Sequence, residues 1–195
     1  QISPSQRSVH FGRRSPVTTT HAILIWLLAA NQAVQASTPA SATACPDLAA
    51  WSANASDEAP EWLLDSAGDS ARVADAGFLR FESSLTSPAF QVPHDGFTLA
   101  FDQVLELSWA NTVAVFELRI GEGEWIDFLA AGGRFVSGGY NVDAFQANPL
   151  GARKAWGGLA RRLDTRAVIP AQAAGQSIEL RFRIGSSGTG DARPG

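Results

Sequence analysis

Residues 177–184 read SIELRFRI, and this stretch decides the fold class because apolar and charged side chains alternate along it. The apolar residues are Ile178, Leu180, Phe182 and Ile184, and the charged ones are Glu179, Arg181 and Arg183. A period of two places successive side chains on opposite faces of a strand. The stretch therefore predicts a strand in a sheet that has one buried face and one face in water.

Weaker alternations of the same kind lie upstream, and each predicts a strand. They cover residues 77–82 (GFLRFE), 98–109 (TLAFDQVLELSW), 112–120 (TVAVFELRI) and 124–128 (EWIDF), with a less regular run at 161–169. The GEG sequence between the third and fourth runs predicts a hairpin turn. No long helical stripe is present, and the 18 glycines favour a turn-rich chain. We expect an all-β fold, a two-sheet antiparallel β-sandwich of the jelly-roll, concanavalin-like kind.

One long segment, residues 138–158 (GGYNVDAFQANPLGARKAWGG), has neither a helical nor a strand period. It is rich in glycine, asparagine and aromatic residues and is flanked by predicted strands. Loops of this length inside a compact domain usually pack on themselves or carry function. We therefore treat it as the first place to look for a site.

The N-terminal region has the pattern of an export signal. Residues 22–30 (AILIWLLAA) form a short apolar run with Arg13 and Arg14 before it and the small-x-small sequence VQA at 34–36 after it. The run is too short to span a bilayer, which takes roughly 20 residues, but it suits a signal helix. We expect a leader at 1–36, a flexible linker at 37–46, the sandwich at 47–188 and an irregular tail at 189–195. The alternative is a helix buried in the domain.

Net charge and cysteine content limit the kinds of partner that this protein can have. The chain has 15 basic and 19 acidic residues, and three of the basic ones precede the first acidic residue, Asp47, so the remainder carries 12 − 19 = −7. This charge argues against a nucleic-acid partner. Cys45 is the single cysteine. In a secreted protein it would be a free thiol, an intermolecular bridge, or half of a pair whose partner lies outside this sequence.

A succession of motifs resembles a known module. It comprises LTSPAFQVP, TLAFDQVLEL, VFELRIGEGEWID, GGYN, NPLGARKAWGG and AGQSIELRFRIGSS, which together cover roughly residues 51–188. This order is similar to the MAM-like jelly-roll domain of secreted bacterial proteins, as found in immune inhibitor A-type metallopeptidases. The resemblance implies an extracellular, non-catalytic accessory or interaction module.

The chain departs from that pattern in two places. Residues 108–111 (SWAN) stand where the family has an acidic, glycine-rich turn, and residues 191–195 (DARPG) stand where it has a closing strand. The second departure predicts a C-terminally incomplete domain. A weaker alternative is a fragment of a secreted metallopeptidase whose catalytic domain is absent.

The potentially reactive residues do not form a recognisable catalytic motif. There is no HExxH motif, and His94 is the single histidine beyond the leader, in a PHDG sequence that predicts a surface turn. We therefore expect no enzymatic activity. A structural calcium ion needs only oxygen ligands, and the loop residues Asp57, Glu58 and Asp143 are its candidate ligands.

The aromatic residues of the 138–158 segment suggest a second function. Tyr140 and Trp156 are candidates for an exposed platform on which a sugar would stack, and Arg153 beside them is a candidate contact for an anionic partner. The simpler interpretation, which we favour, is that both rings pack the loop and that Arg153 lies on a solvated face. Trp125, in an alternating stretch, is expected in the core. The leading hypothesis is an interaction module, and the alternative is a carbohydrate-binding module.

Overall fold

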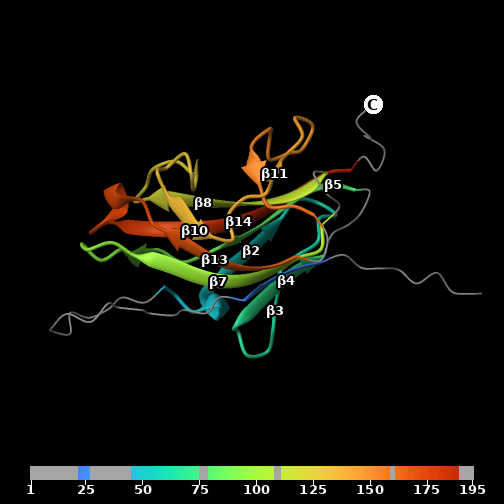
Figure 1. Ribbon diagram of the computed structural model, residues 1–195. Helices are drawn as coiled ribbons and strands as arrows, with labels where there is room; N and C mark the ends of the chain where they lie inside the picture. The colour runs from blue at the N-terminus through green and yellow to red at the C-terminus, as the bar shows by residue number, and fades with distance from the viewer. Residues whose placement is uncertain (1–21, 27–44, 75–78, 108–110, 159–160, 189–195) are drawn as a thin grey trace, which may run out of the picture.

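The computed structural model describes residues 22–26, 45–74, 79–107, 111–158 and 161–188 (Figure 1). These residues form antiparallel sheets joined by turns, with two short 3-10 helices at Leu48–Ala50 and Ala171–Ala173. The prediction of an all-β, sandwich-like fold is confirmed. The predicted tail at 189–195 lies outside the described residues, as does the linker at 37–46 except for Cys45 and Pro46.

The first sheet, called sheet A below, has the order β10-β13-β7-β1-β4-β3. Every pairing in it is antiparallel. Its strands are β10 (Arg134–Ser137), β13 (Arg161–Val168), β7 (Thr98–Leu105), β1 (Ala22–Trp26), β4 (Ser70–Ala74) and β3 (Leu63–Leu64). The runs at 98–109 and 161–169 thus form strands as predicted, although residues 108–110 lie outside the described part of the chain.

The second sheet, sheet B, has the order β2-β5-β14-β8-β9, and the short strand β6 pairs with β14 beside β5. Its strands are β2 (Ser52–Ala55), β5 (Arg80–Thr86), β14 (Ser177–Ser187), β8 (Thr112–Ile120), β9 (Ile126–Asp127) and β6 (Phe90–Gln91). The hairpin predicted around GEG joins β8 to β9. The alternating stretch at 177–184 therefore lies in the middle of this sheet.

The core lies between the two sheets. Phe182 of β14 contacts Phe101 of β7, with ring centroids 5.1 Å apart, and it stacks on Phe116 of β8 at 4.8 Å. The apolar side chains of β14 are fully buried, whereas its charged side chains point away from sheet A. The predicted division into a buried and a polar face is confirmed. Apolar burial of this kind contributes about 25 cal/mol per Å² and is the main force that holds two sheets together.

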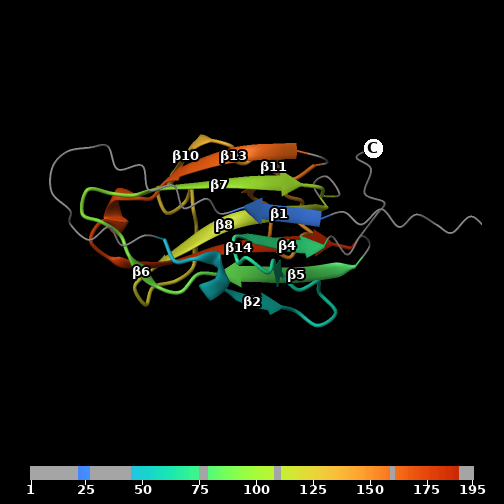
Figure 2. The ribbon, with the colours of Figure 1, turned by 90° about the horizontal axis from the view of Figure 1, so that it is seen from below.

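The apolar run of the predicted leader takes an unexpected place. Ala22–Trp26 is not helical but forms strand β1, which lies between β7 and β4 (Figure 2). The β-branched residues Ile23 and Ile25 favour an extended backbone, and the neighbours on both sides satisfy its peptide groups. The expectation of a helix is therefore wrong for these five residues. The rest of the leader at 1–36 lies outside the described residues, and its role in export stays a prediction.

The 138–158 segment covers part of sheet B. It contains the two-stranded ribbon β11 (Val142–Asp143) and β12 (Lys154–Ala155). Figure 1 shows β11 on the side of β8 and β14 that faces away from β7. There Ala144, Leu150 and Ala155 pack on Val113 and Val115. Strand β8 is therefore buried on both faces, which a simple alternation does not predict. Among the described residues, no helix is long and apolar enough to cross a membrane.

Candidate functional site

Trp156 does not form an exposed platform. Its side chain is 0% exposed and packs against Phe101, Phe135 and Tyr140, with ring centroids 4.8 to 6.0 Å away. The indole N–H donates to the carbonyl oxygen of Gly138 at 2.8 Å. Trp156 is therefore not a stacking surface, because two backbone hydrogen bonds to Ala114 hold it at the edge of β8 with its ring in the core.

Tyr140 also packs within the fold rather than facing solvent. Its ring contacts Phe135 and Trp156, and its hydroxyl accepts the backbone N–H of Phe116 at 2.9 Å. The same hydroxyl lies 3.2 Å from Oδ2 of Asp127. Burial, together with the nearby charge of Asp127, raises the pKa of Tyr140 well above its ordinary value. The phenol therefore stays protonated and acts as a fixed hydrogen-bonding group, so loop packing is the correct alternative for both aromatic residues.

Arg153 lies on the outer face of sheet B, which here means the face turned away from sheet A. It donates to Glu117 at 3.0 Å and forms an ion pair with Asp127. Burial lowers its pKa, but the hydrogen bond and charge of Asp127 and the charge of Glu117 outweigh this, so the pKa is raised. The guanidinium group is therefore a structural cation that anchors the 138–158 segment, and its expected position on a solvated loop face is wrong.

The candidate calcium ligands are dispersed. Asp57 and Glu58 are exposed in the turn after β2, where Glu58 has a positive φ of 62°. Asp143 is exposed on β11 and pairs with Lys154 at 2.9 Å. Within the described ranges, no three His, Cys, Asp or Glu side chains are grouped so that they could hold a metal ion. The structure therefore does not bring the three predicted ligands together.

Glu117 of β8 is the centre of a charged network that the sequence reasoning missed. It is 3% exposed, and its carboxylate accepts hydrogen bonds from Arg153, Arg181 and Arg183. The network extends to β5, because Nε of Arg183 donates to the carboxylate of Glu82 at 3.0 Å. The alternating charges of β8 and β14 are the signal that could have located it, because these strands are neighbours and their charges point to one face.

The electrostatics of this network favour an ionised Glu117. Burial, the largest single effect, raises its pKa, but the charges of Arg183, Arg181 and Arg153 together outweigh it, and the pKa lies below the ordinary value. A buried carboxylate with three guanidinium partners is costly to break, because each group has lost part of its hydration. The network thus fixes the positions of the arginines on the outer face.

Trp125 lies against Arg181 of this network and against Arg119, which pairs with Glu179. The guanidinium carbon of Arg181 is 4.1 Å from the centroid of the indole ring, and that of Arg119 is 4.9 Å away. Both arginines stand on the outer face of neighbouring strands, β14 and β8, so they approach the ring from the side of the sheet. Cation–π attraction holds the ring flat. Trp125 is half-buried, so the expected core position is wrong.

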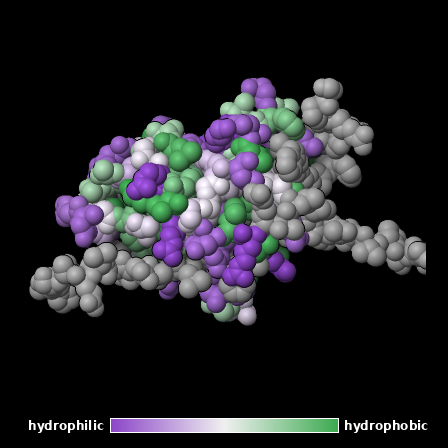
Figure 3. Space-filling view, in the orientation of Figure 1, coloured by the Kyte–Doolittle hydropathy of each residue, from purple (hydrophilic) through white to green (hydrophobic). Residues whose placement is uncertain are grey.

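Exposed apolar side chains follow Trp125 along the chain. Ile126 is 42% exposed and Leu129 is 40% exposed, and Val136 of the edge strand β10 is 57% exposed. Figure 3 shows apolar and polar groups interspersed on the side of the molecule where β10 and the 138–158 segment lie. We call Trp125, Arg119 and Arg181 the Trp125 surface.

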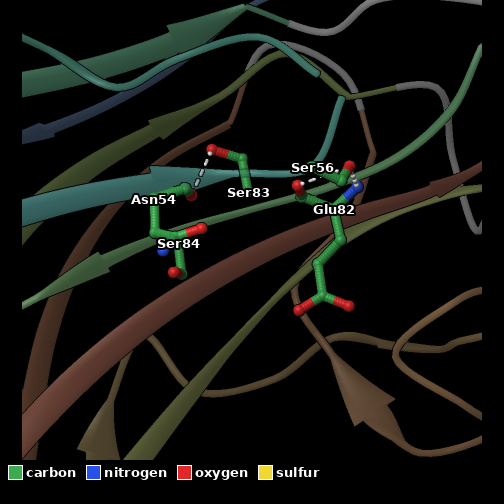
Figure 4. A pocket seen from close by; sticks show the side chains of 5 residues that line it. All are labelled: Asn54, Ser56, Glu82, Ser83 and Ser84. Atoms are coloured by element: carbon green, nitrogen blue, oxygen red, sulfur yellow. Dashed lines mark hydrogen bonds between the residues drawn. The ribbon is translucent and has the colours of Figure 1, made fainter. Parts of the chain in front are cut away.

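A hollow lies at the opposite edge of sheet B, where β2 pairs with β5 (Figure 4). It has a volume of about 290 Å³ and is lined by Asn54, Ser56, Glu82, Ser83 and Ser84. The hydroxyl of Ser83 donates to the carbonyl oxygen of Asn54, and Ser56 donates to that of Glu82. The lining is polar, and through Glu82 it continues into the arginine network. The two regions together make a polar face with one aromatic ring.

Comparisons with family models, with curated proteins and with solved structures found no match to this chain.

Proposed function

We propose that this protein is a non-catalytic binding module of an exported bacterial protein, with the jelly-roll topology of MAM-like domains. Its binding surface is the Trp125 surface on the outer face of sheet B. The observation that carries the proposal is the half-buried indole of Trp125, which lies against the guanidinium groups of Arg119 and Arg181. An aromatic ring fixed in this way is ordered before any partner arrives, which lowers the entropy cost of binding.

The chemistry of the surface fits a protein partner. Tryptophan and arginine are the residues that most often dominate protein–protein binding energies, and they act best inside an apolar surround. Ile126 and Leu129, which follow Trp125 in the chain, are exposed apolar residues at this edge of sheet B. The acidic partners of the arginines keep the surface near neutrality, so shape and apolar contact, rather than long-range charge, would select the partner.

Site-specific cross-linking tests this proposal in the full chain. A photoreactive amino acid replaces Ile126, the exposed residue that follows Trp125 in the sequence, and a matched variant carries it at Leu63, which is also exposed but lies on sheet A. With secreted proteins of the source organism, we expect a defined adduct from position 126 that Trp125→Ala removes. The adduct is identified by mass spectrometry, and the purified partner is then titrated against both proteins. Equal labelling from the two positions, or no adduct at position 126, would overturn the proposal.

A carbohydrate ligand is the second candidate, and the same ring favours it. A partly exposed indole can stack on a sugar ring, and the hollow at the β2–β5 edge of the same sheet offers the hydroxyl and carboxylate groups of Ser84 and Glu82 for hydrogen bonds. A panel of purified oligosaccharides is titrated while tryptophan fluorescence is followed. A saturable change that Trp125→Phe reduces and Trp125→Ala abolishes would favour a glycan. The absence of any response across the panel would remove this candidate.

A further inference from the structure

Strand β1 fills a gap in the middle of sheet A. It pairs antiparallel with β4 through five residue pairs, Ala22↔Ala74 to Trp26↔Ser70, and with β7 through four, Ile23↔Leu105 to Trp26↔Asp102. In the part of the chain that the structure describes, β4 and β7 do not pair with each other. Without β1, sheet A would separate into β10-β13-β7 and β4-β3, and two rows of backbone N–H and C=O groups would face each other unpaired.

The walls of this gap are suited to an extended apolar segment. Ala71 and Val73 of β4 and Leu105 of β7 are buried on the core side. Gln103 of β7 is buried as well, but its amide donates to the hydroxyl of Thr165 at 3.0 Å, so its polar group is already satisfied within the sheet. An occupant thus needs backbone groups for both walls and uncharged side chains over this part of the core.

The occupant seen in the structure is connected to the domain by a long segment. Eighteen residues, 27–44, separate Trp26 from Cys45. Ala22–Trp26 lies within the leader that is predicted to end at Ala36, so export with cleavage at that point would remove β1 and leave the gap open. A sheet opened in its middle would expose both unpaired edges and the apolar floor between them.

We propose that the gap between β4 and β7 is a strand-acceptor site. Its ligand class is an extended, uncharged apolar segment of another polypeptide that lies antiparallel to both walls, and Ala22–Trp26 occupies the site within the uncleaved chain. This inference goes beyond the proposed function, because it concerns sheet A rather than the Trp125 surface. The two can fail separately, since Trp125→Ala would leave strand acceptance unchanged.

Peptide binding to the full chain tests the site. Leu24→Pro removes a backbone donor from the centre of β1 and should expel that strand, because proline is not tolerated in a central strand. The probe is a labelled synthetic peptide of residues 20–28 with two added lysines for solubility, and the control peptide carries proline at position 24. We expect saturable binding of the first peptide to the Leu24→Pro chain with a rise in its Tm, and no binding of the control.

The wild-type chain supplies a second comparison. Its own β1 competes at a high effective concentration, so the probe should bind it at least about tenfold more weakly than it binds the Leu24→Pro chain. Equal binding to both chains, or a folded Leu24→Pro chain that does not bind the probe, would overturn the proposal.

Cross-strand disulfides test the placement of β1 without relying on the proline variant. Leu24 lies opposite Arg72 on one side and Val104 on the other. Oxidation should cross-link Leu24→Cys with Arg72→Cys, with Val104→Cys, or with both. The matched control pairs Leu24→Cys with Leu64→Cys on β3, which β4 separates from β1 by about 9 to 10 Å, beyond disulfide reach. The single Leu24→Cys variant reports any bond to Cys45. Failure of both test pairs, or cross-linking of the control pair as fast as either test pair, would refute the site.

Discussion

The hydroxyl of Tyr140 hydrogen-bonds to both backbone groups of Phe116, at 2.9 Å from the nitrogen and 3.0 Å from the oxygen. A side chain of the 138–158 segment thus takes the place of a strand neighbour at this point of β8. The contact joins the irregular segment to the sheet that carries the core, and it explains why a segment without periodicity is ordered against sheet B.

Replacing Tyr140 with phenylalanine should destabilise the protein. The ring would remain, but the N–H of Phe116 would lose its acceptor in a half-buried place, which costs about 1 to 3 kcal/mol. Urea denaturation followed by circular dichroism measures the loss. As a control, Phe145→Leu changes an exposed side chain of the same segment and should stay within about 0.5 kcal/mol of the wild type. A Tyr140→Phe protein as stable as the wild type would show that this hydrogen bond has no net effect.

Glu117→Gln should lower stability at neutral pH by about 2 kcal/mol, since it leaves three guanidinium groups without their shared carboxylate while they keep part of their contact with water. The variant should also change the response to acid. Because the folded-state pKa of Glu117 is lowered, its contribution is complete above the unfolded pKa of about 4.3. It is lost as the pH falls through the folded value.

Denaturation at several pH values between 7 and the acid limit of folding measures this effect. The wild type should lose stability on acidification more steeply than Glu117→Gln, so that the two curves converge at low pH. Glu122→Gln, in the exposed turn between β8 and β9, should run parallel to the wild type. Parallel curves for wild type and Glu117→Gln would contradict the lowered pKa.

Sequence patterns predicted sheet B better than sheet A for a physical reason. In β14 one face packs on the core and the other carries charges, so the alternation is visible in the residues themselves. The same alternation could have predicted that Trp125 lies outside the core. Trp125 and Asp127 point to one face of the strand, whereas Phe128 points to the other face and is buried. Strand β1 was not predicted as a strand, because a short apolar run after arginines has the same composition in a signal peptide and in a central strand.

The candidate site could be predicted only in part from the sequence, for a similar reason. The charges of Glu117, Arg181 and Arg183 were predicted to face away from the core, but not to converge on one carboxylate. That convergence depends on the pairing of β8 with β14 and on Arg153, which arrives from the non-periodic 138–158 segment. Long-range register and loop conformation are not encoded in a local period. The partly exposed indole on this face is therefore that of Trp125, whereas Trp156 packs in the core, as the loop-packing interpretation expects.

Cys45 should be unreactive in the folded protein. Burial, with a smaller contribution from Asp47, raises the pKa of its thiol to about 12, whereas an exposed cysteine titrates near about 8.5. At pH 8 the thiolate population should be lower by roughly three orders of magnitude. Iodoacetamide labelling of a Ser52→Cys variant compares both thiols in one molecule, because Ser52 is exposed on β2. Position 52 should label rapidly and Cys45 only after denaturation, and equal native rates would show that Cys45 is accessible.

Gly185 should be required for the 138–158 segment to dock on β14. A Cβ at this position would lie 2.7 Å from Cγ of Leu150 and 2.9 Å from Oδ1 of Asn148, closer than van der Waals contact allows. The amide of Asn148 also donates to the carbonyl oxygen of Gly185 at 2.9 Å, so the turn at 148–150 lies directly on the strand. Gly185→Val should displace this turn and lower stability by about 1 to 3 kcal/mol through overpacking.

Limited trypsin digestion gives a local measurement of that displacement. Arg153 and Lys154 follow the turn, and Arg153 is held by Glu117 and Asp127 in the native protein. Cleavage at these residues should be faster in Gly185→Val, because proteolysis requires local unfolding of the segment. Ser84→Val adds the same side chain to the outer face of the same sheet, but beside the open hollow, and should leave the cleavage rate unchanged. If Gly185→Val is cut no faster than Ser84→Val, the close approach at Gly185 does not hold the segment, and its order comes from its other contacts, such as those of Tyr140, Arg153 and Trp156.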